Sequence, residues 1–198
     1  MKKSVVLACA IALMMLCGCT GYREIDQGYI VTAIGFKKNS DETEIVLEVL
    51  TPSGTAEKVK DTNVLSGTGK SEKEAYNDIK SQLVKDIYLD HCGLVAIEGG
   101  FNTKELTEVL QFCNTLQSLN IGAYVINTNN VEDLFDAKAV RMSVGYDVIR
   151  LIKNAAKGNG QSFSNQVYQL QRDFSAGKSP QIPLVNITDK KISLELGR

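Results

Sequence analysis

The run Cys92 to Glu98 (CGLVAIE) most constrains the fold, because an almost wholly apolar segment of this length is typical of a strand buried on both faces. Such strands lie inside sheets that carry helices on either side. Amphipathic helical patterns flank the run on both sides, over residues 71–87 and 102–116. Ile121 to Asn127 is a second apolar strand pattern. The middle of the chain therefore predicts alternating strands and helices.

Both flanking helices have recognisable start signals. Ser71 with Glu74, and Asn102 with Glu105, have the spacing of a capping box, in which side chains satisfy free amides of the first turn. The residues before the first helix, Gly67 to Ser71, end in Gly-Lys-Ser. They are not a phosphate-binding loop, because Val64 stands where that motif requires its first glycine.

The rest of the chain adds strands at both ends. We expect strands at 28–36, 44–50 and 58–66, a short helix or turn at 131–139, two helices between 143 and 175, and strands at 184–187 and 192–196. The predicted fold class is α/β (α+β), a mixed β-sheet with packed helices, β-rich ends and a helical segment near 140–175. Residues 28–198 form this region, with a subdomain boundary expected near 50–65.

The N-terminus has the layout of a secretory signal. Lys2 and Lys3 precede an apolar run, Val5 to Leu16, that is too short to span a bilayer of roughly 30 Å as a helix. Leu16-Cys17-Gly18-Cys19 follows, which is the lipobox pattern of bacterial lipoproteins. We expect residues 1–18 to be removed, Cys19 to carry a covalent diacylglycerol through a thioether, and residues 19–27 to form a tether. No other cofactor is expected.

Composition narrows the function classes. Without Lys2 and Lys3 the chain keeps 20 of its 22 basic residues against 23 acidic ones, and no basic block occurs, so nucleic acid is not an expected partner. Cys92 and Cys113 either form a disulfide outside the cytoplasm or are buried as small apolar residues. No paired Cys-x-x-Cys occurs, so no structural zinc site is expected.

No catalytic set is recognisable in the chain. His91 is the only histidine, and its neighbour Cys92 would point to the opposite face of a strand, so the two are poorly placed to act together. The HExxH and GxSxG motifs do not occur. We therefore expect a binding or assembly subunit rather than an enzyme.

Several stretches resemble the Ger(x)C family, the lipoprotein C subunits of spore germinant receptors. Cys19, then Arg23-Glu24-Ile25, then a strand ending in Gly35 are similar to the family's start. The resemblance continues over most of the chain, in Gly67, Gly69 and Ser71 before Glu74-Ala75, in His91 before Leu94 to Ile97, in Ala123 to Val125, and in Gly177 to Pro183.

The chain departs from the family pattern at three places. Thr20 to Tyr22 replace the family's Trp-Asp, and Thr115 and Asn120 stand where arginines are common. The chain ends at Arg198, near where the family's C-terminal region begins, so that region is expected to be absent.

The resemblance implies a membrane-anchored subunit of a spore nutrient germinant receptor, with a scaffolding or assembly role in germination. Its implied location is the outer face of the cytoplasmic (inner spore) membrane, and its implied partners are two integral-membrane receptor subunits. The alternative is a substrate-binding lipoprotein of a transporter, although such proteins are usually longer. A lipid-anchored hydrolase is a further alternative without a supporting motif.

Overall fold

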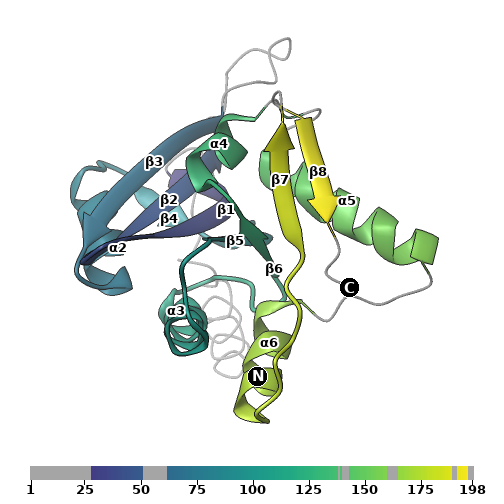
Figure 1. The fold of residues 1–198 in the computed structure, drawn as a ribbon. Helices are drawn as coiled ribbons and strands as arrows, with labels where there is room; N and C mark the ends of the chain where they lie inside the picture. The colour runs from purple at the N-terminus through teal and green to yellow at the C-terminus, as the bar shows by residue number, and fades with distance from the viewer. Residues whose placement is uncertain are drawn as a thin grey trace, which may run out of the picture.

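The structure is a computed structural model that describes residues 28–50, 62–137, 139, 143–159, 165–188 and 191–195. These residues form an eight-stranded sheet in the order β3-β2-β1-β5-β6-β7-β8, with β4 beside β1 (Figure 1). The strands are β1 (Gly28–Asn39), β2 (Glu42–Leu50), β3 (Thr62–Gly69), β4 (Asp86–Tyr88), β5 (Leu94–Glu98), β6 (Tyr124–Thr128), β7 (Leu184–Thr188) and β8 (Lys191–Glu195). The helices are α2 (Glu72–Ser81), α3 (Thr103–Thr115), α4 (Val131–Asp136), α5 (Val144–Asn159) and α6 (Val167–Ser175).

The sheet is mixed, as the sequence predicts. The first three strands form an antiparallel meander, and β7 and β8 form an antiparallel hairpin. Between them, β1, β5, β6 and β7 run parallel to one another, and β4 pairs in parallel with the first residues of β1. The predicted α/β class with β-rich ends is therefore confirmed.

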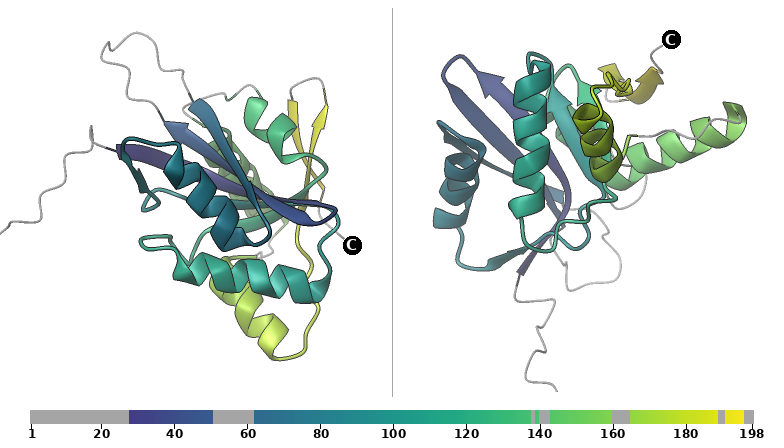
Figure 2. Two further views of the ribbon diagram at one scale, coloured as in Figure 1. Left: turned by 90° about the vertical axis from the view of Figure 1, so that its left-hand side faces the viewer. Right: turned by 90° about the horizontal axis from the view of Figure 1, so that it is seen from below.

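Helices cover both faces of the sheet. On one face α3 packs between α2 and α6, and on the other face α4 and α5 lie together (Figures 1 and 2). Strand β5 shows why the central apolar run has no polar face. Val95 and Ile97 belong to the core under α2, α3 and α6, while Leu94 and Ala96 belong to the core under α4 and α5. Burial on both faces requires apolar residues at every position.

Some predicted boundaries are wrong. Strand β3 continues to Gly69, beyond the predicted end at Ser66. Helix α2 ends at Ser81, and Ile87, which fits the helical spacing, instead lies in β4, where it pairs with Tyr29. Helix α5 continues through Gly158 to Asn159, so this glycine does not terminate it. The predictions for residues 1–27 and 51–61 lie outside the described residues, and so does much of the expected subdomain boundary.

Candidate functional site

The structure describes five of the nine residues singled out by sequence. Cys19, Arg23, Glu24 and Ile25 lie outside the described residues, whereas Gly35, Gly67, Gly69, Ser71 and His91 lie within them. The five do not form one site. Gly67, Gly69 and Ser71 lie together where β3 leads into α2, while Gly35 lies beneath α4 on the opposite face of the sheet.

Gly67 and Gly69 allow α2 to pack directly on the backbone of β3. A Cβ at Gly67 would lie 2.6 Å from the carbonyl oxygen of Ala75 and 2.8 Å from the amide nitrogen of Ile79. A Cβ at Gly69 would lie 2.5 Å from the amide nitrogen of Ala75. Residues two apart on a strand face the same side, so the Gly-x-Gly pattern clears one continuous strip for the helix. The pattern therefore allows close packing of α2 on β3.

Gly35 has the same role on the other face. A Cβ there would come within 2.2 Å of Cγ1 of Val131, the first residue of α4, and 3.2 Å from the ring of Phe135. Strand β1 is therefore closely covered by α4 at this point.

Ser71 is the N-cap of α2, as predicted, but the capping box is shifted. Its Oγ accepts a hydrogen bond from the amide of Glu74 at 3.3 Å. The Glu74 carboxylate accepts from the amide of Lys70 at 2.9 Å rather than from that of Ser71. Ser71 thus satisfies one free amide of the first turn, and Glu74 binds the amide of the residue before the N-cap.

His91 and Cys92 differ in solvent exposure. His91 is an exposed turn residue between β4 and β5, whereas Cys92 is fully buried. Cys92 and Cys113 are both free and buried, which confirms the interpretation as small apolar residues over the disulfide. Burial raises the pKa of the Cys92 thiol to about 12, so it stays protonated at neutral pH.

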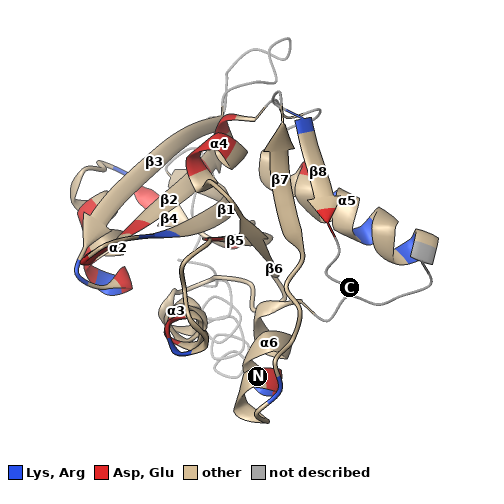
Figure 3. Ribbon diagram, viewed as in Figure 1, with Lys and Arg blue, Asp and Glu red and all other residues tan. Residues whose placement is uncertain are grey.

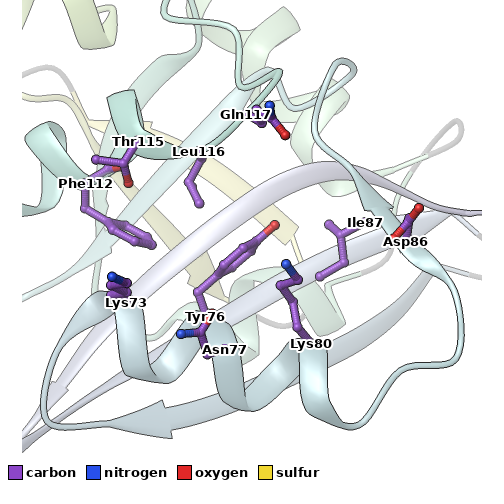
Figure 4. A pocket seen from close by; sticks show the side chains of 10 residues that line it. All are labelled: Lys73, Tyr76, Asn77, Lys80, Asp86, Ile87, Phe112, Thr115, Leu116 and Gln117. Carbon is purple, nitrogen blue, oxygen red and sulfur yellow. The ribbon is translucent and has the colours of Figure 1, made fainter. Parts of the chain in front are cut away.

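An open groove of about 630 Å³ lies between α2, β4 and the end of α3 (Figure 4). The rings of Tyr76 and Phe112 meet edge to face at 6.2 Å in its wall. Partial burial raises the pKa of the Tyr76 phenol. The other lining residues are mostly polar: Lys73, Asn77, Lys80, Asp86, Ile87, Thr115, Leu116 and Gln117. No sequence signal could identify this groove, because its walls come from three separate elements without a shared motif.

Sequence reasoning also missed the role of Glu48, which is fully buried on β2. One carboxylate oxygen accepts from the amide of Val144 at 2.7 Å. The other accepts from the amide of Gly145 at 3.0 Å and from the hydroxyl of Thr32 at 2.7 Å. Glu48 thus caps the N-terminus of α5 from a distant strand. Burial nevertheless raises the pKa of its carboxyl, because desolvation outweighs these hydrogen bonds.

Among the described residues, charge does not mark a separate site. Basic and acidic side chains are spread over several elements, with acidic residues on α4 and basic ones along the outer part of α5 (Figure 3). Within the part of the chain that the structure describes, no group of three or more His, Cys, Asp or Glu is placed to hold a metal ion. Among the same residues, no helix combines the length and apolarity needed to cross a bilayer.

Comparison with protein families gives one clear match. A family described as the spore germination protein N-terminal domain matches residues 21–187. A search of curated proteins and one of solved structures found no match to this chain. The matched region covers every helix that the structure describes, strands β1 to β6 and all but the last residue of β7, including the close-packed glycines of β1 and β3. The chain therefore belongs to the spore germination proteins, and its role lies in spore germination.

Proposed function

We propose that this protein is a lipid-anchored subunit of a spore nutrient germinant receptor and that it acts as a scaffold for the receptor complex. The observation that carries the proposal is the position of the family match. It begins at residue 21, two residues after Cys19 of the lipobox. The predicted signal and the predicted lipidation cysteine therefore stand immediately before the matched region.

The proposed location is the outer face of the cytoplasmic (inner spore) membrane. Two acyl chains hold a protein firmly there, because each buried CH₂ contributes about 0.8 kcal/mol. The proposed partners are two integral-membrane receptor subunits. In this arrangement the domain provides a contact surface for its partners rather than catalytic groups.

Substitution of Cys19 tests the proposal. Cys19→Ala removes the thiol that would carry the lipid, so the protein should leave the membrane fraction of sporulating cells and nutrient-triggered germination should fall. Cys17→Ala is the matched control, because it removes a neighbouring thiol of the same segment and should leave both properties unchanged. Mass spectrometry of the N-terminal peptide reports the lipid directly.

Two results would contradict the proposal. One is a Cys19→Ala protein that still sediments with membranes and supports germination. The other is a wild-type protein whose Cys19 carries no lipid. Co-purification of two multi-span membrane proteins with the wild-type chain is expected, and its absence would refute the receptor assignment while leaving the anchor intact.

A further inference from the structure

Three parts of the described chain meet at one end of the domain, which we call the tether end. They are Gly28 at the start of β1, the loop 82–85 between α2 and β4, and the loop 116–123 between α3 and β6. Gly28 pairs with Asp86, the residue that follows the first loop. Asp86 and Gln117, from the second loop, line the same groove. The two loops therefore lie near Gly28, the first described residue after the predicted tether.

Each of these loops carries one exposed large apolar side chain, and Val64, also exposed, lies apart from them on β3. Of the four large apolar residues that are markedly exposed among the described ones, Val84 is 94% exposed and lies in the first loop. Ile121 is 53% exposed and lies in the second loop. Tyr168 at the start of α6 is 43% exposed and adjoins Ile121, whose carbonyl accepts a hydrogen bond from the Tyr168 amide at 3.1 Å. Single exposed apolar residues are ordinary, but their grouping at one end marks a contact surface.

The length of the tether limits what that surface can meet. Nine residue steps separate Cys19 from Gly28, and a fully extended chain covers at most about 3.3–3.6 Å per residue, so Gly28 lies within roughly 30 Å of a lipid on Cys19. Tethering at this range gives the adjoining surface a high effective concentration at the bilayer. A weak apolar contact is then enough to orient the domain.

We propose that the tether end rests on the bilayer, with Val84 and Ile121 inserted at the headgroup level and Tyr168 at the interface beside them. The proposal depends on the proposed lipidation of Cys19. The contact is apolar rather than electrostatic, because Lys80 and Lys85 are balanced by Asp86 and Asp90 in the same stretch of sequence. Tyrosine suits this position, since its ring is amphipathic and its hydroxyl remains hydrated.

The opposite end of β1 then points into the aqueous phase. The turn between β1 and β2 holds Ser40 and Asp41, both exposed. It lies about 35–40 Å from Gly28 along the strand, at about 3.3 Å per residue. The turn between β1 and β2, and not the tether end, is left accessible from solution.

Depth-dependent quenching tests the orientation in the full lipidated chain. Bimane is attached to Val84→Cys, Ile121→Cys or Asp41→Cys, and the protein is reconstituted into phosphatidylcholine vesicles with and without phosphatidylglycerol, each containing nitroxide-labelled lipid. The buried native cysteines Cys92 and Cys113 do not compete for the label in the folded protein. Quenching at 84 and 121 should exceed that at 41 several-fold in both vesicle types.

The outcomes separate this inference from the proposed function. If Cys19 carries its lipid and the protein floats with vesicles, but quenching at 84 or 121 does not exceed that at 41, the orientation is refuted and the anchor stands. Such a result would assign the apolar loops to a protein partner instead. If Cys19 carries no lipid, both the orientation and the anchor are refuted.

A charge substitution provides an independent test. Val84→Asp places a carboxylate where the bilayer contact is proposed, and it should reduce quenching at position 121 several-fold while lipidated protein stays on the vesicles. Ser40→Asp adds the same charge at the far end and should change nothing. Equal quenching at 121 in both variants would overturn the proposal. Circular dichroism of each variant shows that the fold is retained.

Discussion

The substitution Glu48→Gln tests how much the buried carboxylate that caps α5 contributes to stability. The Glu48 carboxylate is fully buried and accepts two backbone amides at the start of α5 as well as the Thr32 hydroxyl. Glutamine keeps the shape but replaces one oxygen with an NH₂ group. Whichever way the amide is turned, that NH₂ faces a backbone N–H that has lost its acceptor. An unsatisfied buried donor costs about 1–3 kcal/mol, and this sets the expected loss of unfolding free energy.

The loss should depend on pH with a definite sign. Burial raises the pKa of Glu48 in the folded protein above its value in the unfolded chain. The unfolded carboxyl ionises first as pH rises, so the stability contributed by Glu48 is full below the unfolded pKa of about 4.3 and is lost as pH rises through the folded pKa. The slope for one group cannot exceed about 1.4 kcal/mol per pH unit. Glutamine has no such slope, so Glu48→Gln should destabilise more at pH 5 than at pH 8.

Urea unfolding followed by circular dichroism measures both effects. Wild type, Glu48→Gln and the exposed control Glu42→Gln are compared at pH 5 and pH 8, and the control should differ from wild type by less than about 0.5 kcal/mol. A larger loss at pH 8 than at pH 5 would refute the reasoning. It would mean that the helix terminus and its hydrogen bonds outweigh desolvation and lower the pKa of Glu48.

Three further changes test the packing, one helix start and a buried thiol. Gly67→Ala should cost about 1–3 kcal/mol in thermal or urea unfolding, because its Cβ meets backbone of α2 that cannot move aside, whereas Gly99→Ala has no neighbour within 4 Å and should be nearly neutral. Unchanged stability in Gly67→Ala would contradict the close approach. Asn102→Ala removes a side chain that accepts two amides of α3 and should cost about 1 kcal/mol in the same measurement. The Cys92 thiol, with its pKa raised to about 12 by burial, should react with maleimide at pH 8 only after denaturation, and rapid labelling of the native protein would show that the site opens.

Local signals in the sequence predict the elements that local interactions determine. Asn102 and Glu105 form the complete capping box that their spacing predicts, with each side chain accepting the other residue's amide. Strand β5 is buried on both faces because the residues on each of its two faces are apolar. In these cases the cause lies within a few residues of the effect.

Predictions from the sequence fail where contacts with residues far away in the chain determine the local structure. Ile87 fits the helical stripe of α2, yet its pairing with Tyr29 of β1 places it in a three-residue strand. Gly67 and Gly69 have weak strand propensity, but the lack of side chains is what allows α2 to cover β3 at this point. Tertiary contacts override local preference at both places.

Sequence patterns cannot predict the groove or the Glu48 cap of α5, because both are formed by residues far apart in the chain. The bond from Val144 to Glu48 joins residues 96 apart. The groove combines side chains of α2, β4 and α3 that share no motif. From its neighbours in the sequence alone, Glu48 is an ordinary strand carboxylate between two apolar residues.

The order of strands in the sheet has a consequence for how the chain can fold if it is exported as we propose. After the meander of β1 to β3, each later strand of the main path, β5, β6, β7 and then β8, joins the sheet beyond the one before it. No later strand of that path has to be inserted between two strands already paired. A chain that emerges from a translocation channel N-terminus first could therefore extend its sheet in step with its emergence. On the proposed route, the described residues that appear first are those of β1, the strand on which the rest of the sheet assembles.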